Sequence, residues 1–270
     1  MMIDNEDLKF NFGCASCGYK EVKRRIPVSR IISKLDELLS KNEMDEVTRL
    51  LDNWRKEATE IGDLSGELSI VNEQLGHFRK VQNREAGLES VERSIELVEL
   101  LGIENEVSGA TILLNAATTL KAFGEPEKAL PIYDKTYAVY AAKLDINDAR
   151  FGGFFNNKGL TLQDLCRFDE AKECYDKALE ITQKIEGGLA DCAVTYVNLA
   201  HLFEKSMEDS ENAVNSALEK AKKILDGDEI ERNSYYAFVC SKCAPSFDYF
   251  GFFYYANELK ERSKRIYEGA

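Results

Sequence analysis

The sequence predicts an all-α fold in which five to six antiparallel helix pairs stack in a row. Three observations predict it. Small and aromatic residues recur at a nearly constant interval, helix-favouring residues are abundant beside only 4 prolines, and glycine or proline separates the apolar segments. One such pair cannot bury its apolar stripe alone, so neighbouring pairs must pack together into a continuous core.

The interval is clearest around Gly159, which stands twelve residues before Ala171. Tyr175 and Ala178 follow Ala171 after four and seven residues, offsets that place these side chains on one face of a helix. The matching positions along the chain are Val47, Gly87, Ala129, Ala171, Ala213 and Tyr255, separated by 40, 42, 42, 42 and 42 residues. Regular spacing of this kind indicates an internal repeat of one helix pair.

Each repeat is expected to hold two helices, in a repeat domain spanning 28–270 that follows an irregular segment at 1–27. The first helices are predicted at 29–41, 64–80, 106–123, 149–165, 189–205 and 230–244. The second helices are predicted at 44–61, 84–101, 126–144, 168–186, 208–226 and 252–267. The breaks agree with local chemistry, because Gly102 suits a helix C-terminus, Pro126 suits a first turn and Gly227 marks a turn.

The set formed by Gly159, Ala171, Tyr175 and Ala178 resembles the tetratricopeptide repeat family, and the resemblance extends over roughly residues 28–268. The standard repeat of that family has 34 residues. The period here is 42 residues, which adds about one turn to each helix. In this respect the chain resembles the long-helix variants of the repeat found in kinesin light chain, in spindle-orientation adaptors and in bacterial peptide-sensing regulators. The resemblance implies a right-handed α-α superhelix, a solenoid whose concave face binds a protein or peptide.

The composition bounds the class of partner and the compartment. A formal net charge of −13 argues against nucleic acid and anionic membranes as partners, and favours basic or amphipathic polypeptides. No apolar run approaches the ~18 residues of a membrane span. The first nine residues lack the apolar centre of a signal peptide, so we expect a cytoplasmic protein.

Asparagines recur in the predicted first helices, at Asn72, Asn115, Asn157 and Asn198, separated by 43, 42 and 41 residues. Asparagine is a mediocre residue for a helix interior, so the repetition needs a reason. A carboxamide can pair with both the N–H and the C=O of an extended peptide. Several tetratricopeptide proteins carry asparagine at the matching concave position, so the resemblance implies peptide-backbone binding. The alternative is that each asparagine bonds a neighbouring helix.

Helical spacing places further side chains on the same face as the asparagines. These are Thr111, Thr118, Gly153, Leu160, Val194 and His201. The groove that they line is expected to be mixed and mildly apolar. It carries no Lys or Arg at the positions where some members of the family clamp a terminal carboxylate, so we do not expect a carboxylate clamp.

Two C-x-x-C pairs, Cys14 with Cys17 and Cys240 with Cys243, have the spacing of zinc ligands. They stand at opposite ends of the repeat array, and the second pair lies inside a predicted helix. We therefore expect no metal site, while a zinc site formed across a dimer, or by the N-terminal pair with other ligands, stays open as an alternative. The remaining cysteines outside these pairs, Cys166, Cys174 and Cys192, are predicted to be small core residues on helices.

Motifs of catalysis are absent from the sequence. It has 2 histidines, and neither stands in a nucleophile motif, a zinc-protease motif or a phosphate-binding loop. We therefore expect no enzyme activity, no catalytic residues and no cofactor.

The densest run of aromatic residues comes near the end of the chain, at Phe247, Tyr249, Phe250, Phe252, Phe253, Tyr254 and Tyr255. One interpretation is that these rings close the core of the last repeat. The other is an exposed patch that forms a homodimer or docks a partner.

Together these observations predict an adaptor or scaffold that binds an extended or helical polypeptide in its concave groove. The alternatives are a stand-alone peptide-sensing regulatory protein and a structural assembly protein that oligomerises through its aromatic end. Whether the N-terminal segment, with Phe10, Phe12 and Tyr19, occupies the groove is left open by the sequence.

Overall fold

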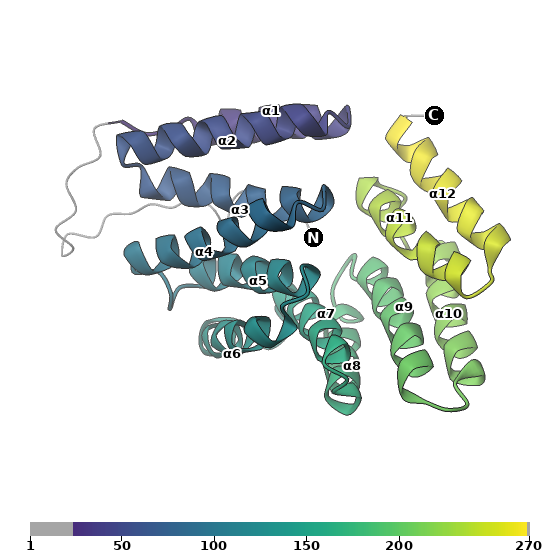
Figure 1. Ribbon diagram of the computed structural model, residues 1–270. Coiled ribbons are helices and arrows are strands. Elements are labelled where there is room, and N and C mark those ends of the chain that lie inside the picture. The colour runs from purple at the N-terminus through teal and green to yellow at the C-terminus, as the bar shows by residue number, and fades with distance from the viewer. Residues whose placement is uncertain (1–23, 269–270) are drawn as a thin grey trace. The chain divides into compact units, whose positions relative to one another are not determined.

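The computed structural model describes residues 24–268 of the chain. Over this range the chain forms twelve α-helices that pack in consecutive pairs (Figure 1). The all-α prediction is therefore confirmed. The helices form two compact units that meet in the sequence at Lys143 and Leu144, with six helices in each. Among the described residues, no helix combines the length and the apolarity that a membrane span requires.

The first unit contains α1 (Val28–Ser40), α2 (Met44–Ile61), α3 (Leu64–Lys80), α4 (Arg84–Leu100), α5 (Val107–Ala122) and α6 (Pro126–Lys143). Each predicted helix of this unit lies within two residues of its expected bounds. The apolar stripes pack into a core, one cluster of which joins Leu35 and Leu38 of α1 to Val47 and Leu51 of α2 and Ile70 of α3.

Polar side chains fix where helices of the first unit begin. The carboxylate of Asp63 caps α3 by accepting a hydrogen bond from the N–H of Gly66 at 3.1 Å. The same carboxylate accepts from the N–H of Ile26 at 3.0 Å, and Ile26 is buried in the core. Asp63 thus starts one helix and also anchors the chain that enters α1.

A buried ion pair joins α3 to α4. Glu67 is 1% exposed, and both of its carboxylate oxygens accept hydrogen bonds from Arg93, at 2.7 Å from Nε and 2.7 Å from Nη2. The bidentate geometry satisfies a charge that would otherwise be costly to bury. The hydrogen bonds that the guanidinium donates to Glu67 raise the pKa of Arg93 above its usual value.

The second unit contains α7 (Ala149–Asp164), α8 (Phe168–Thr182), α9 (Leu189–Ser206), α10 (Glu211–Asp226), α11 (Ser234–Tyr249) and α12 (Phe253–Glu268). In its first pair, α7 and α8 approach closely because Gly159 has no side chain. A Cβ added there would lie 2.7 Å from the ring of Tyr175, which is fully buried. In this pair, the small residue and the aromatic residue of the repeat pattern therefore pack against each other.

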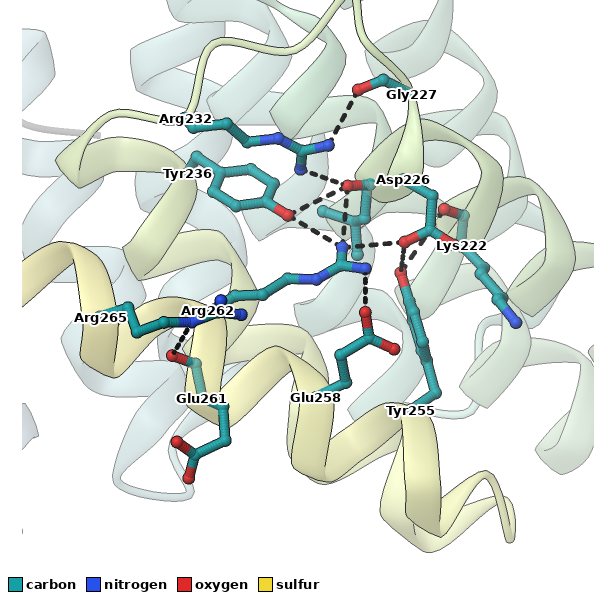
Figure 2. A network of polar contacts seen from close by, with 11 residues as sticks. Lys222, Asp226, Gly227, Arg232, Tyr236, Tyr255, Glu258, Glu261, Arg262 and Arg265 are labelled. Atoms are coloured by element: carbon teal, nitrogen blue, oxygen red, sulfur yellow. Dashed lines mark hydrogen bonds and ion pairs between the residues drawn. The ribbon is translucent and has the colours of Figure 1, made fainter. Parts of the chain in front are cut away.

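Arg262 ties the last pair of helices to α10, as Figure 2 shows. Its Nη1 lies 2.8 Å from the carboxylate of Asp226 and donates to the hydroxyl of Tyr236 at 3.0 Å. Tyr255 donates to the same carboxylate at 2.9 Å. The network therefore connects α10, α11 and α12 through the side chain of one arginine.

Three predictions about helix bounds in the second unit were wrong. The eleventh helix runs from Ser234 to Tyr249, although 230–244 was expected, because the side chain of Asn233 caps it by accepting from the N–H of Tyr236. Pro245 lies inside this helix. The eighth helix ends four residues early, at Thr182, and the tenth begins at Glu211 where 208 was expected.

The anchor positions of the repeat are buried in both units, with one exception. Ala213 is only half-buried, and Val214 points into the core in its place. The late start of α10 shifts the register there by one residue. Cys166 is a second correction, because it is exposed and has a left-handed backbone with φ of 57° in the turn after α7. It is not a core residue on a helix, whereas Cys174 and Cys192 are buried on α8 and α9 as predicted.

Candidate functional site

In the first unit, two of the predicted asparagines lie together on neighbouring first helices. Asn72 of α3 is buried and Asn115 of α5 is half-buried. The Nδ2 of Asn115 donates to the Oδ1 of Asn72 at 2.9 Å. Forty-three residues of sequence separate them, so the helical repeat is what brings the two carboxamides into contact.

In the second unit, two asparagines on neighbouring first helices are also hydrogen-bonded, but one of them is Asn156 and not the predicted Asn157. The Nδ2 of Asn198 on α9 donates to the Oδ1 of Asn156 on α7 at 3.2 Å. Asn156 in turn donates to the hydroxyl of Thr195 at 2.7 Å. Asn157, the residue predicted from the sequence, is the next residue of α7 and is half-buried. Asn156 and Thr195 were therefore missed by the sequence reasoning.

A usable signal for Asn156 was present in the sequence. Asn156 and Asn198 are 42 residues apart, the period of the repeat, whereas Asn157 and Asn198 are 41 apart. Reading the period backwards from Asn198 would have selected Asn156. Counting 42 residues forward from Asn115 selected Asn157 instead. The two counts differ by one residue because Asn115 and Asn198 are 83 residues apart, one fewer than two periods of 42.

Each pair of carboxamides forms one hydrogen bond between its members, and this bond uses only part of their capacity. A carboxamide has two N–H donors and an oxygen that can accept two hydrogen bonds. The bond from Asn115 to Asn72 occupies one donor of the first residue and one lone pair of the second. We call each of these two pairs, Asn72 with Asn115 in the first unit and Asn156 with Asn198 in the second, the amide face of its unit.

The threonines predicted beside the asparagines are both hydrogen-bonded. Thr111 lies 2.8 Å from the hydroxyl of Tyr140, and Thr118 lies 3.3 Å from the hydroxyl of Tyr133, both tyrosines being on α6. Each threonine also donates to the backbone of its own helix at 2.8 Å. Both are half-buried, as are Leu160 on α7 and Val194 on α9.

His201, the last residue predicted for this site, contacts α11. Its Nε2 lies 2.9 Å from the hydroxyl of Ser246, and its ring lies 4.8 Å from the ring of Phe250. Burial lowers the pKa of His201 below its usual value, so its imidazole is mainly neutral at pH 7. The residue contributes a polar but uncharged group to the second unit.

The two cysteines of α11 are poorly suited to bind a metal, because burial keeps the thiol of Cys243 protonated. Cys240 and Cys243 are both buried, and burial raises the pKa of the Cys243 thiol to about 12. A metal binds the thiolate rather than the thiol. No group of three or more histidine, cysteine and acidic side chains in residues 24–268 is arranged to hold a metal ion. Cys14 and Cys17 lie outside the described residues, as do Phe10, Phe12 and Tyr19.

The aromatic run near the C-terminus divides into two groups. Phe247 and Tyr255 are buried, and their rings meet edge to face with centroids 4.8 Å apart. Tyr249, Phe253 and Tyr254 are exposed, and Tyr254 is 95% exposed. Both interpretations from the sequence thus describe part of the run, a core contact and a set of exposed rings.

Comparison with known proteins gives the same fold. Residues 154–235 match the family model of the tetratricopeptide repeat, a family that generally mediates protein–protein interactions. A comparison with curated protein sequences gives no match.

Solved structures resemble the chain over most of its length. BtubC (BKLC) from P. vanneervenii is 16% identical, with a TM-score of 0.51 over 91% of this chain and 92% of that one. The nearly identical TPR-like repeats of a candidate kinesin light chain from Podosopora anserina are 14% identical, with a TM-score of 0.50 over 73% and 92%. These identities establish a likeness of fold alone. The described helices thus have the fold of TPR-like repeat structures, and residues 154–235 are similar to the tetratricopeptide repeat.

Proposed function

We propose that this chain is an adaptor in which each unit binds an extended polypeptide segment at its own amide face. The observation that carries the proposal is the repetition of a carboxamide pair on neighbouring first helices, once in each unit. A repeated group at a repeated position suits a ligand whose own hydrogen-bonding groups repeat, and a peptide backbone is such a ligand. In this proposal, the donors and acceptors that the bonds between the asparagines leave unused pair with the N–H and C=O groups of that backbone.

The hydrogen bond between the two asparagines of each pair also favours peptide binding. Each carboxamide is oriented by its partner before a ligand arrives, so binding costs less side-chain entropy than it would for two free asparagines. Helical spacing puts Thr118 beside the carboxamides of the first unit, and Leu160, Val194 and the neutral His201 beside those of the second, so each surround is uncharged. Such a surround selects weakly among side chains, as expected of a site that reads the backbone.

Removal of the amide pairs tests this proposal. Peptides of twelve residues are selected for binding from a random library, and their affinity is measured by fluorescence anisotropy. We expect the variant with Asn72, Asn115, Asn156 and Asn198 all changed to Ala to bind at least tenfold more weakly, since each lost hydrogen bond is worth about 0.5–1.5 kcal/mol.

Asn257→Ala is the matched control, because Asn257 is an exposed asparagine within a helix. Circular dichroism must show equal helix content in all variants. Equal peptide affinity in the quadruple variant and the control would contradict the proposal. It would leave the carboxamides as contacts between helices, a function that loss of thermal stability alone would reveal.

A second candidate function is self-association through the exposed rings of Tyr249, Phe253 and Tyr254. The observation that favours it is their exposure at the junction of α11 and α12, where burial of three large rings would stabilise an interface.

A further inference from the structure

A groove of about 460 Å³ lies in the first unit, on a surface that the amide face does not use. Its walls come from α2 and the start of α4, and α3 forms its floor. The residues of α3 that line it are Gln74 and Phe78. Gln74 is two positions after Asn72, which turns its side chain by roughly 200° around the helix. The groove and the amide face therefore lie on opposite sides of α3.

Gln74 carries a buried acceptor without a partner. The residue is 1% exposed, and its Nε2 donates to the Oδ1 of Asp52 at 2.8 Å. Its Oε1 is buried with no hydrogen-bond partner. An exchange of the amide nitrogen and oxygen cannot remove the problem, because a carboxylate only accepts hydrogen bonds and the nitrogen must face Asp52.

An unpartnered buried carbonyl oxygen costs about 1–3 kcal/mol, so its presence needs an explanation. A cationic donor that enters the groove can take the place of Nε2 at Asp52. The carboxamide is then free to turn about its soft terminal torsion and to accept from the same donor through Oε1. The other repeats have Ala117, Gly159 and Ala200 at the position of Gln74. A small residue would fill this position without the cost, which suggests a specific use for the carboxamide.

The charges around the groove favour a cation. Arg55 pairs with Glu89 at 3.0 Å, and Lys56 pairs with Glu60 at 3.9 Å, so these four lining charges balance. Asp52 is the fifth charged lining residue, and the hydrogen bond that it receives comes from the neutral Gln74. The groove thus presents the exposed carboxylate of Asp52, and the carboxamide that donates to it carries the buried, unpartnered Oε1. The chain as a whole has a net charge of −13.

We propose that this groove binds the guanidinium group of an arginine side chain from a partner polypeptide. A guanidinium is planar, always charged and has five N–H donors, so one such group can pair with Asp52 and donate to Oε1 of Gln74 at the same time. The ammonium of lysine has the charge but not the fork of two parallel donors. The volume of the groove leaves room for residues that flank the arginine.

The probe for the test is Nα-acetyl-arginine amide, and its neutral isostere Nα-acetyl-citrulline amide is the matched control ligand. Both are titrated into the ¹⁵N-labelled chain, and the side-chain NH₂ resonance of Gln74 and the backbone amides of α2 are followed by NMR. We expect saturable shifts at Gln74, Thr48 and Asp52 with the arginine compound, and binding at least tenfold weaker with citrulline.

Two variants locate the interaction. Asp52→Asn should weaken arginine binding at least fivefold, whereas Glu92→Gln, which removes the same charge from an exposed position of α4, should leave it unchanged. Gln74→Leu should abolish the Asp52-dependent binding while the melting temperature stays equal or rises, because the unpartnered acceptor is gone.

The inference fails if citrulline binds as well as arginine, if Glu92→Gln weakens binding as much as Asp52→Asn, or if Gln74→Leu retains full affinity. Its failure is distinct from failure of the amide-face proposal. The quadruple asparagine variant leaves the lining of the groove intact and should keep its affinity for the arginine compound.

Discussion

The protonation of Glu73 makes the stability of the first unit depend on pH. It lies on α3, where burial raises its pKa to about 7 and the charge of Asp36 on α1 adds to the effect. The unfolded chain titrates Glu73 near its ordinary value, about 4.5. Between these two values the folded chain holds a proton that the unfolded chain releases. The contribution of Glu73 therefore makes the free energy of unfolding fall as pH rises from about 4.5 to 7.

The change Glu73→Gln removes this titration. We expect the variant to be more stable than the wild type at pH 8, by roughly 2–3 kcal/mol at most, and equal to it near pH 4. Urea unfolding at both pH values measures the difference. Equal stabilisation of the variant at both pH values would show that the carboxylate does not titrate between them.

At the scale of the element, the size of a single residue decides how closely two helices can pack. Gly159 on α7 allows the ring of Tyr175 to approach, whereas Gly76 on α3 faces open space, with Arg79 3.9 Å from the position of an added Cβ. The same substitution should thus have opposite effects at the two sites.

We expect Gly76→Ala to stabilise the chain by about 0.5–1 kcal/mol through helix propensity. Gly159→Ala should destabilise it by about 1–3 kcal/mol, since the contact at 2.7 Å forces Tyr175 out of its position and outweighs the propensity gain. Thermal denaturation of the two variants measures both signs. Stabilisation by Gly159→Ala would contradict the packing argument.

At the scale of the whole molecule, the exposed rings of α11 and α12 bear on the oligomeric state. Phe253 and Tyr254 are 61% and 95% exposed at the start of α12. If the chain associates through them, sedimentation equilibrium should show an average mass that rises with concentration toward twice that of the chain. The double variant Phe253→Ser/Tyr254→Ser should remain at the monomer mass.

Tyr267→Ser provides the control for this experiment, because Tyr267 is also exposed on α12 but lies more than three turns away. It should leave the association unchanged. A wild-type chain whose mass does not depend on concentration would remove the assembly hypothesis.

The sequence by itself determined the class of fold and the place of nearly every helix. Periodic burial is the reason, because the apolar face of each helix must pack against its neighbours, as Gly159 of α7 packs against the ring of Tyr175 in α8, and this need repeats along the chain. The start of α11 escaped prediction because a single capping side chain, Asn233, decides it.

Only the tertiary structure decided which side chains meet between repeats. The sequence placed asparagines on one helix face, but a shift of one residue chose Asn156 over Asn157 as the partner of Asn198. It also gave no sign that Oε1 of Gln74 lacks a partner, because Asp52, on another helix, takes the amide nitrogen. Helical periodicity specifies the direction of a side chain from local rules, whereas a hydrogen bond depends on distances that the packing of separate helices sets.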